Sequence, residues 1–228
     1  MTREEFIKIL PELVHDYQAA PEVLDHISNV DLLMVIGGTG VGKTSIIKRL
    51  GIPYVPSDTT RPMRPNEING MDYFFRTDYD QLVAEIKERK FVQVNIFQTG
   101  DFYGTRAGAF PEVGFAVYAV VADKVPLFRQ LGFSETISAF VTPPNFIEWM
   151  QRIDRNNIES DQLSKRLEEA KVSFNFALND SQVHFILNDD LDKAVYQTKM
   201  LINGKPDPNR QAAARIAAEA IYKELAFA

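Results

Sequence analysis

A glycine-rich stretch near the start of the chain constrains its fold more than any other feature. The stretch reads Gly37-Gly38-Thr39-Gly40-Val41-Gly42-Lys43-Thr44. It follows an apolar run, residues 31–36, typical of a strand buried on both faces, and residues 43–50 after it have the character of a helix. The order strand, G-x-x-x-x-G-K-[ST], helix is the context in which such a loop binds phosphate, and it predicts an α/β fold.

Each part of this loop has a chemical reason. Glycines let the backbone turn with its amides facing inward and leave no Cβ in the way of phosphate oxygens. The helix that begins near Lys43 adds positive potential at its N-terminus. Lys43 supplies a charge between the outer phosphates, and the hydroxyl of Thr44 suits Mg²⁺. The residues expected to bind the triphosphate of ATP are Gly38, Thr39, Gly40, Val41, Gly42, Lys43, Thr44 and Ser45.

The rest of the chain alternates strand-like and helix-like segments. Further strands are expected at residues 91–97, 115–122, 136–141 and 183–187, and helices at residues 78–89, 145–178 and 191–201. This alternation predicts a layered α/β fold with a mainly parallel core sheet.

Helices are also expected at both ends of the chain. Over residues 3–19 apolar residues recur at helical spacing, and Pro11 is expected to bend or restart that helix. Residues 204–208 read as a linker before an alanine-rich helix at residues 211–227. Its apolar stripe is expected to comprise Ile216, Ala220, Ile221 and Leu225. The stripe would dock either on its own domain or on a second copy of the chain.

Composition limits where and on what the protein acts. None of the 228 residues is cysteine, which excludes disulfides, thiolate catalysis and cysteine-ligated zinc and makes a reducing, cytoplasmic location the default. The net charge of −6 gives no overall attraction to nucleic acid or to an anionic membrane. No apolar run approaches the ~20 residues that span a bilayer, and no secretory signal is visible.

A second informative segment, residues 57–75, carries arginines among hydroxyl groups. Arg61 and Arg64 lie in an extended, proline-containing stretch that would hold their side chains rigidly. Arginine grips phosphate with a two-pronged guanidinium, and the phenols of Tyr73 and Tyr103 could add neutral donors. The pattern predicts a site for a single phosphate group in addition to the loop.

Together, these motifs resemble those of the guanylate kinase family. The resemblance rests on S-x-T-T-R-x-x-R-x-x-E-x-x-G-x-x-Y-x-F at residues 57–75, Y-G-T at 103–105, T-P-P at 142–144 and N-D-D-L at 188–191. It implies a P-loop three-layer fold with a mainly parallel core sheet at residues 31–204, between a helical extension (1–30) and a C-terminal linker and helix (205–228). Within it, the resemblance implies an inserted region that binds a nucleoside monophosphate, about residues 53–110, and a helical lid, about residues 145–170.

The resemblance also implies roles for individual residues. Four would hold the acceptor's phosphate: Arg61, Arg64, Tyr73 and Tyr103. Ser57 and Thr105 would lie near the acceptor base, and Asn188 near the adenine of ATP. Three arginines would surround the transferring phosphoryl group: Arg152, Arg155 and Arg166. Phosphoryl transfer needs positioning and charge stabilisation, so Lys43, these arginines and Mg²⁺ with ATP suffice without a side-chain nucleophile.

Three places depart from the family pattern. Where the family reads guanine with a glutamate, this chain has Gln93, one residue further than expected from Tyr103. Asp123 stands where a D-x-x-G motif is expected but lacks the glycine, and the lid is one residue shorter between Arg152 and Arg155. A carboxylate accepts both neighbouring donors of guanine, whereas an amide has one acceptor and one donor. An unpaired buried polar group costs ~1–3 kcal/mol, so base specificity is expected to be altered.

The favoured hypothesis is an ATP-dependent kinase that converts a purine nucleoside monophosphate, GMP or dGMP first, to the diphosphate. Its partners would be ATP and the monophosphate, with no nucleic acid and no membrane, and it would act as a monomer or homodimer. One alternative is a kinase for another acceptor, such as dAMP or a modified nucleotide, which Gln93 favours. A second is a non-catalytic protein-binding module of the same family, although such modules typically lose the phosphate loop. A third is a P-loop ATPase, which would have no use for Arg61 and Arg64.

Overall fold

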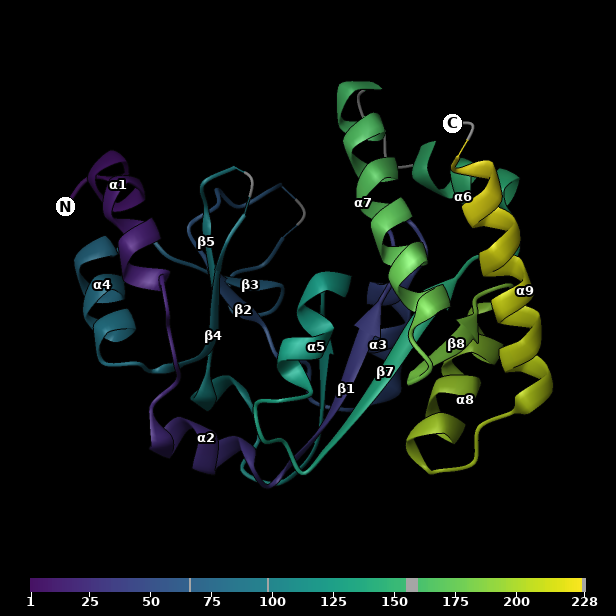
Figure 1. The fold of residues 1–228 in the computed structure, drawn as a ribbon, viewed down its shortest axis with the longest axis horizontal. Helices are drawn as coiled ribbons and strands as arrows, with labels where there is room; N and C mark the ends of the chain where they lie inside the picture. The colour runs from purple at the N-terminus through teal and green to yellow at the C-terminus, as the bar shows by residue number, and fades with distance from the viewer. Residues whose placement is uncertain (66, 98, 155–159, 227–228) are drawn as a thin grey trace. The chain divides into compact units, whose positions relative to one another are not determined.

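The computed structural model describes residues 1–65, 67–97, 99–154 and 160–226, with residues 160–162 described by their backbone alone (Figure 1). The chain forms two compact units. The first unit comprises Met1–Asp31, Val55–Ala116 and Gln130–Ser134, and the second comprises Leu32–Tyr54, Val117–Arg129 and Glu135–Ala228.

The second unit is built on a four-stranded sheet. Its strands, in spatial order, are β6 (Gly114–Ala119), β1 (Val30–Ile36), β7 (Glu135–Thr142) and β8 (Val183–Leu187). β7 and β8 are parallel, with Phe140 opposite Phe185. β1 is almost wholly buried, as expected for a strand covered on both faces. The mainly parallel sheet confirms the predicted α/β fold.

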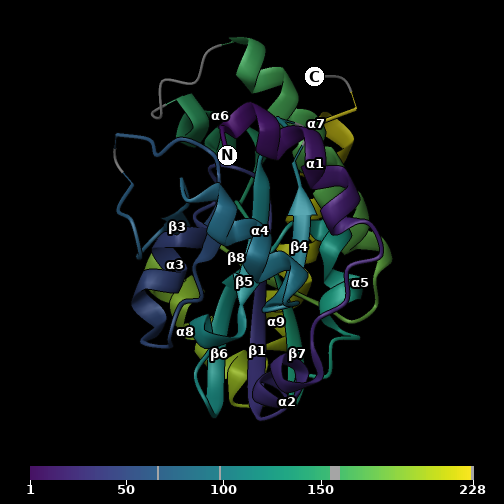
Figure 2. The same ribbon diagram turned by 90° about the vertical axis from the view of Figure 1, so that its left-hand side faces the viewer.

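Two pairs of helices flank this sheet. α7 (Ser160–Asn179) packs against α9 (Pro208–Glu224), and α3 (Lys43–Leu50) packs against α8 (Leu191–Ile202), as Figures 1 and 2 show. α6 (Phe146–Asp154) precedes α7, so the predicted helical stretch contains two helices. The strand predicted at residues 115–122 ends earlier, at Ala119. A 3₁₀ turn, Ala122–Lys124, leads instead into α5 (Val125–Phe128), because Pro126 suits the first turn of a helix.

The first unit has its own four-stranded sheet. Its strands, in spatial order, are β3 (Tyr73–Phe75), β2 (Ser57–Thr59), β5 (Phe102–Arg106) and β4 (Phe91–Ile96). β2 and β3 are parallel, whereas β5 is antiparallel to both of its neighbours. α1 (Arg3–Val14) and α4 (Tyr79–Lys87) lie side by side (Figure 1), and α2 (Pro21–Ile27) contacts a 3₁₀ turn, Ala107–Ala109. Their shared core contains Phe6, Leu10, Leu82, Val83, Ile86, Phe91 and Phe102.

α1 runs through Pro11 as one helix, so the alternative that the helix restarts there is wrong. The helix begins with a capping box, in which Thr2 and Glu5 each accept a hydrogen bond from the other's backbone N–H. Phe6 and Leu10, one turn apart, are fully buried. Their burial offsets the hydrogen bond that Pro11 cannot donate, so the helix continues to Val14.

α9 packs on its own unit, but through a face that differs from the predicted stripe. Its buried residues are Ala214, Ala218 and Ile221, and Leu225, directly after the helix, is also buried. Ile216 is 67% exposed and Ala220 is also exposed, so the prediction was wrong for these two residues. Small alanine side chains let the helix approach β8 and α7 closely, which a stripe through Ile216 would not allow.

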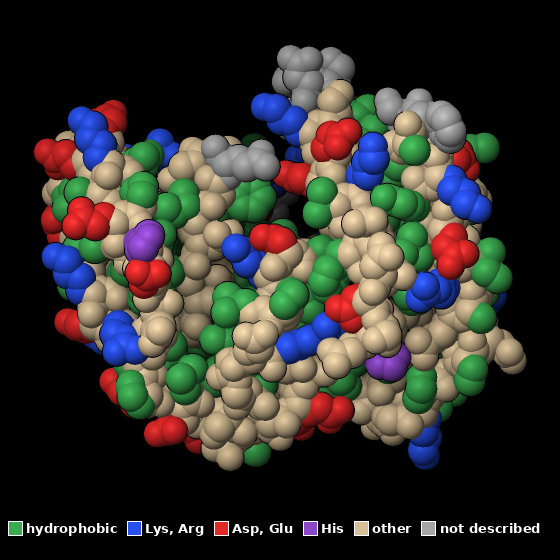
Figure 3. All heavy atoms as spheres, in the orientation of Figure 1, with side chains coloured by type: hydrophobic (Ala, Val, Ile, Leu, Met, Phe, Trp, Pro, Cys, Tyr) green, Lys and Arg blue, Asp and Glu red, His purple; other side chains and the backbone are tan. Residues whose placement is uncertain are grey.

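Charged side chains of both signs are interspersed on the face drawn in Figure 3. Within the described ranges, no helix is both long and apolar enough to cross a bilayer. The same ranges contain no group of three or more histidine, aspartate or glutamate side chains placed to hold a metal ion.

Candidate active site

The phosphate loop joins β1 to α3 in the second unit, as the sequence predicts. Gly37, Gly40 and Gly42 have φ angles of 142°, 79° and 99°, which favour glycine. A Cβ on Gly42 would lie 2.2 Å from Asn188 Nδ2, and one on Gly37 would lie 2.8 Å from the carbonyl oxygen of Val141. At these two positions glycine is required both by backbone conformation and by lack of space.

Lys43 begins α3 and turns its ammonium group back into the loop. Its Nζ donates to the carbonyl oxygens of Gly37 at 2.5 Å and Gly38 at 2.8 Å. Burial lowers the pKa of Lys43 from 10.5 to about 8. Thr44 and Ser45 are exposed in the first turn of the same helix. Backbone amides, an ammonium group and hydroxyls thus meet at one helix N-terminus, which suits a polyphosphate.

Two side chains from elsewhere in the second unit hold the loop. Trp149 of α6 donates from Nε1 to the carbonyl oxygen of Thr39 at 2.8 Å, and Asn188, which follows β8, donates from Nδ2 to that of Val41 at 2.7 Å. Trp149 is fully buried and Asn188 is 6% exposed. Sequence reasoning missed Trp149, although the only tryptophan in the chain was an available signal. The expected contact of Asn188 with adenine stays a prediction.

Of the three arginines expected in the lid region, the structure describes Arg152 and Arg166. Arg152 of α6 donates to the carbonyl oxygen of Asn188 at 2.9 Å and pairs with Glu148, so it lies next to a residue that holds the loop. Arg166 is half-buried on α7. Arg155 lies outside the described residues. The roles of all three in phosphoryl transfer stay predictions.

Asp123 lies in the second unit, whereas the other candidate acceptor residues lie in the first. Its side chain is 62% exposed and pairs with Lys124 at 3.5 Å. Asp123 lines an open surface pocket together with Arg129 and Asp180. The proposed contact of Asp123 with the acceptor base stays a prediction.

Arg61 is the centre of the predicted single-phosphate site in the first unit. Its Nε donates to the Tyr103 hydroxyl at 3.2 Å, and its guanidinium lies 5.2 Å from the centroid of the Tyr73 ring. The two Nη atoms donate to the carboxylate of Glu67 at 3.0 and 2.8 Å. The Arg61 side chain is 13% exposed, whereas that of Arg64 is 61% exposed. The structure therefore gathers Arg61, Tyr73 and Tyr103 and leaves Arg64 at the surface.

Glu67 holds Arg61 much as a phosphate would, a role that sequence reasoning did not assign. Its carboxylate also accepts from the Arg64 backbone N–H at 2.8 Å. Burial alone would raise the pKa of Glu67, but the hydrogen bonds from Arg61 and Arg64 outweigh it and lower the pKa. Because two carboxylate oxygens match the guanidinium fork as two phosphate oxygens do, the site is already arranged for an anion.

Gln93, Thr105 and Ser57 form a row of polar side chains across β4, β5 and β2. Gln93 Nε2 donates to Thr105 Oγ1 at 3.3 Å, and the hydroxyl oxygens of Thr105 and Ser57 are 3.3 Å apart. Their exposed fractions are 6%, 0% and 5%. The structure thus brings together three residues expected at the acceptor base, while their contact with a base stays a prediction.

A buried ion-pair network braces the same sheet. Arg76 pairs with Asp58, Glu85 and Asp78, each at 2.8 Å, and Arg106 donates to Asp58 at 3.0 Å. Asp58 is fully buried, and this burial raises the pKa of Asp58 despite both arginines. The network was not predicted, because residues so far apart in sequence carry no shared local pattern.

Replacing Arg76 with Met is expected to lower the free energy of unfolding by about 3–5 kcal/mol, because it leaves the buried carboxylates of Asp58 and Glu85 short of a partner. The loss should be smaller at acidic pH, where a protonated Asp58 no longer needs a cation. Urea denaturation at several pH values measures both effects. Arg106→Met, which removes a more exposed partner, should cost less. An equal cost for both variants would contradict this account.

Comparison with known proteins decides the family. The guanylate kinase family model matches residues 29–205. The chain belongs to the guanylate kinase family. It is therefore a phosphotransferase of the nucleoside-monophosphate kinase class. The matched range begins close to β1 and ends between α8 and α9, so that α1, α2 and α9 lie outside it.

Relatives of the guanylate kinase family resemble the chain over most of their length. The guanylate kinase of Nostoc sp. is 30% identical over 184 residues, which cover 76% of this chain and 89% of that protein. The guanylate kinase of Prochlorococcus marinus is 32% identical over 180 residues, which cover 75% and 96%. The crystal structure of guanylate kinase from Anaplasma phagocytophilum has the same fold, with a TM-score of 0.57 at 18% identity and coverage of 84% and 94%.

Proposed function

We propose that this guanylate kinase family member transfers the terminal phosphoryl group of ATP to a purine nucleoside monophosphate, with GMP and dGMP preferred. One observation supports the proposal: the chain has two clusters of side chains that suit phosphate, and they differ in kind. The second unit offers a glycine loop with Lys43 for a polyphosphate, and the first offers Arg61 with Tyr73 and Tyr103 for a single phosphate. An ATPase without an acceptor would need only the loop.

On the donor side, the amides of residues 38–45 would bind the triphosphate of ATP. Lys43 would exchange the two carbonyl oxygens that it now holds for phosphate oxygens. The exposed hydroxyl of Thr44 suits a hard cation, and Mg²⁺ bound with ATP would neutralise charge on the outer phosphates. Arg152, Arg155 and Arg166 would stabilise charge on the transferring group.

On the acceptor side, the monophosphate would displace the carboxylate of Glu67 from Arg61. A phosphate carries more charge than a carboxylate and can also accept from the Tyr103 hydroxyl, which already bonds Arg61 Nε. Tyr73 would add a second phenol, and Arg64 would reach the phosphate from the surface. In this arrangement the acceptor phosphate itself is the nucleophile, and the protein supplies positioning and charge.

The base would be read by Gln93 with Ser57 and Thr105, which lie together in the first unit. A glutamine side chain offers one donor and one acceptor, so it can pair with one guanine donor but not with two neighbouring donors. The relatives named guanylate kinase support GMP as the acceptor, and Gln93 supports weaker discrimination among purines.

An acceptor panel tests the proposal. The purified protein is assayed with ATP and Mg²⁺ against each ribo- and deoxyribonucleoside monophosphate, and kcat/KM is measured for each. We expect GMP and dGMP to be best, with adenine nucleotides accepted less well. Best turnover on a pyrimidine monophosphate would reject the purine assignment, and an absence of transfer to every monophosphate would reject the function.

Gln93→Glu is expected to raise the ratio of kcat/KM for GMP to kcat/KM for AMP by about 5- to 150-fold. The reason is that a carboxylate can accept from both neighbouring donors of guanine, whereas the amide of Gln93 can accept from only one. Asn95→Asp is the matched control, since it adds the same charge two residues away on the same face of β4. An equal change of the ratio in both variants would mean that charge alone, and not the position of Gln93, sets the preference.

A reducing, cytoplasmic location is part of the proposal, because the chain has no cysteine to oxidise. ATP and the monophosphate would be its partners. The protein would act as a monomer or a homodimer, and light scattering on the purified protein distinguishes the two.

A further inference from the structure

α9 lies outside the range matched by the family model. Its first turn nevertheless forms hydrogen bonds with residues at the end of β8, next to the phosphate loop. Asp207 caps the helix by accepting from the backbone N–H of Arg210 at 3.1 Å. The guanidinium of Arg210 forms a two-pronged pair with Asp189 at 3.0 and 2.7 Å and donates to the carbonyl oxygen of Leu187 at 2.9 Å. One side chain therefore binds the residues on both sides of Asn188.

Asn188 is the residue that holds the loop. Its side chain donates to the carbonyl oxygen of Val41, and its backbone N–H donates to that of Thr142 at 2.8 Å. The absence of room for a Cβ on Gly42 shows how closely the Asn188 side chain approaches the loop. A small shift of the strand end would therefore move Asn188 Nδ2 away from Val41.

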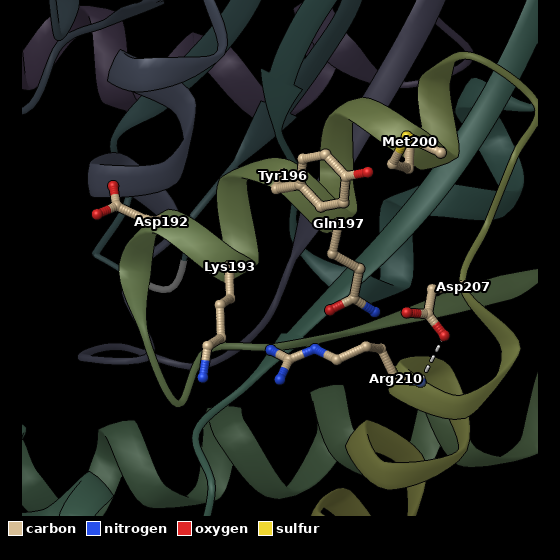
Figure 4. Close-up of a pocket in the computed structure, with 7 residues that line it drawn as sticks. All are labelled: Asp192, Lys193, Tyr196, Gln197, Met200, Asp207 and Arg210. Carbon is tan, nitrogen blue, oxygen red and sulfur yellow. Dashed lines mark hydrogen bonds between the residues drawn. The ribbon is translucent and has the colours of Figure 1, made fainter.

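α8 holds the same strand end from another direction. Gln197 accepts from the backbone N–H of Leu187 at 3.2 Å and donates to the carbonyl oxygen of Phe185 at 2.8 Å. Figure 4 shows Arg210 extending from α9 past Gln197, in the wall of a pocket that Lys193 and Tyr196 also line. Leu187 is thus held at its N–H by α8 and at its carbonyl by α9.

Arg210 and Asp189 form a bidentate ion pair. A two-pronged, charge-assisted pair fixes orientation as well as distance. The hydrogen bond from Arg210 lowers the pKa of Asp189, so the carboxylate is ionised at neutral pH. The two side chains are 23% and 32% exposed, so water reaches part of the pair and its strength comes from the two-pronged geometry.

We propose that Arg210 is a positioning residue of the triphosphate site: it fixes residues 187–189 so that Asn188 can hold the loop at Val41. The inference rests on the proposed function in one respect, that residues 37–44 bind ATP. It assigns a part in ATP binding to a helix beyond the family's matched range. Displacing a binding group by a fraction of an ångström is enough to weaken binding, which is why a remote anchor matters.

The test compares Arg210→Met with Arg215→Met. Arg215 lies on the same helix, pairs with Glu219, donates to the Leu178 carbonyl oxygen and lies over the ring of Phe185. Its loss therefore also weakens the packing of α9 on β8, but it removes no hydrogen bond to residues 187–189. Trp149, whose Nε1 donates to the loop at Thr39, is the single tryptophan, so its fluorescence is expected to change when ATP binds. The Kd for ATP should rise about 5- to 20-fold in Arg210→Met and stay near wild type in Arg215→Met.

Kinetics separate positioning from general destabilisation. Arg210→Met should raise the KM for ATP without changing the KM for the monophosphate. Arg210→Lys should recover only part of the affinity, because an ammonium group cannot reproduce the fork. Asp189→Asn combined with Arg210→Met should weaken ATP binding no more than Arg210→Met alone.

Two results would overturn the inference: an unchanged Kd for ATP in Arg210→Met, or an equal rise in Arg210→Met and Arg215→Met. If Arg210→Met does not fold, the comparison of Arg210→Lys with Arg215→Lys decides in the same way. Failure of the wild-type protein to bind ATP would instead reject the proposed function. Wild-type ATP binding with no effect of Arg210 rejects the positioning role alone.

Discussion

Lys43→Met is expected to reduce kcat/KM for ATP by roughly 10³-fold, with the fold unchanged. The ammonium group is the one charge inside the loop, where it holds two carbonyl oxygens at 2.5 and 2.8 Å. Methionine keeps much of the side chain's length and apolar stem but removes that charge. Steady-state kinetics with GMP as acceptor, together with the Trp149 fluorescence titration, measure the loss in turnover and in ATP affinity.

Lys48→Met is the matched control, because Lys48 lies on the same helix with its side chain exposed. Its kcat/KM should stay near wild type. The pH dependence adds a second criterion. Because burial lowers the pKa of Lys43 to about 8, Lys43 is charged below that pH and loses its charge above it. ATP affinity should therefore fall as the pH rises above about 8, and Lys43→Met should abolish this fall. Turnover that survives Lys43→Met would mean that the loop is not the donor site.

Arg61→Met is expected to raise the KM for the monophosphate by about 10²-fold, because the acceptor phosphate loses its two-pronged partner. Arg61 is the least exposed cation of the acceptor site, and Tyr73, Tyr103 and Glu67 all contact it. The Kd for ATP from Trp149 fluorescence should not change, because Trp149 and the loop belong to the other unit. Initial rates over a range of GMP concentrations provide the measurement.

Lys87→Met is the control for Arg61→Met, since it removes one positive charge from an exposed position of the same unit. It should leave the KM for GMP unchanged. Arg64→Met should have a smaller effect than Arg61→Met, because the Arg64 side chain is largely exposed. If Arg61→Met changed the Kd for ATP and left the KM for GMP alone, the acceptor assignment would be wrong.

Much of the fold could be predicted because its signals are local. The strand at residues 183–187 matches β8, and the helices at residues 43–50 and 191–201 match α3 and α8 within a residue. A short apolar run bounded by glycine or proline is compatible with few secondary structures other than the one observed. The α9 stripe was wrong because an alanine-rich helix presents several faces of similar polarity. Close packing then selected the face with Ala214 and Ala218, and Ile216 was left in solvent.

The residues of the candidate site likewise fall into those that the sequence predicted and those that it did not. The structure places Arg61, Tyr73 and Tyr103 together, as the resemblance implied from two separate motifs, while their contact with a phosphate stays a prediction. Glu67 as the partner of Arg61, and the network around Arg76, were not predicted. Charged residues are common at surfaces, and nothing in a one-dimensional pattern marks which of them fold inward to form pairs.

The sequence by itself determined the phosphate loop, because its glycine φ angles and the start of α3 depend on consecutive residues. Tertiary structure decided what keeps the loop in place. Trp149, Asn188 and Arg210 contribute hydrogen bonds to the loop, or to the strand end beside it, from positions far along the chain. The physical reason is range: a turn is set by the torsion angles of neighbouring residues, whereas the partners of its carbonyl oxygens are set by how distant helices pack.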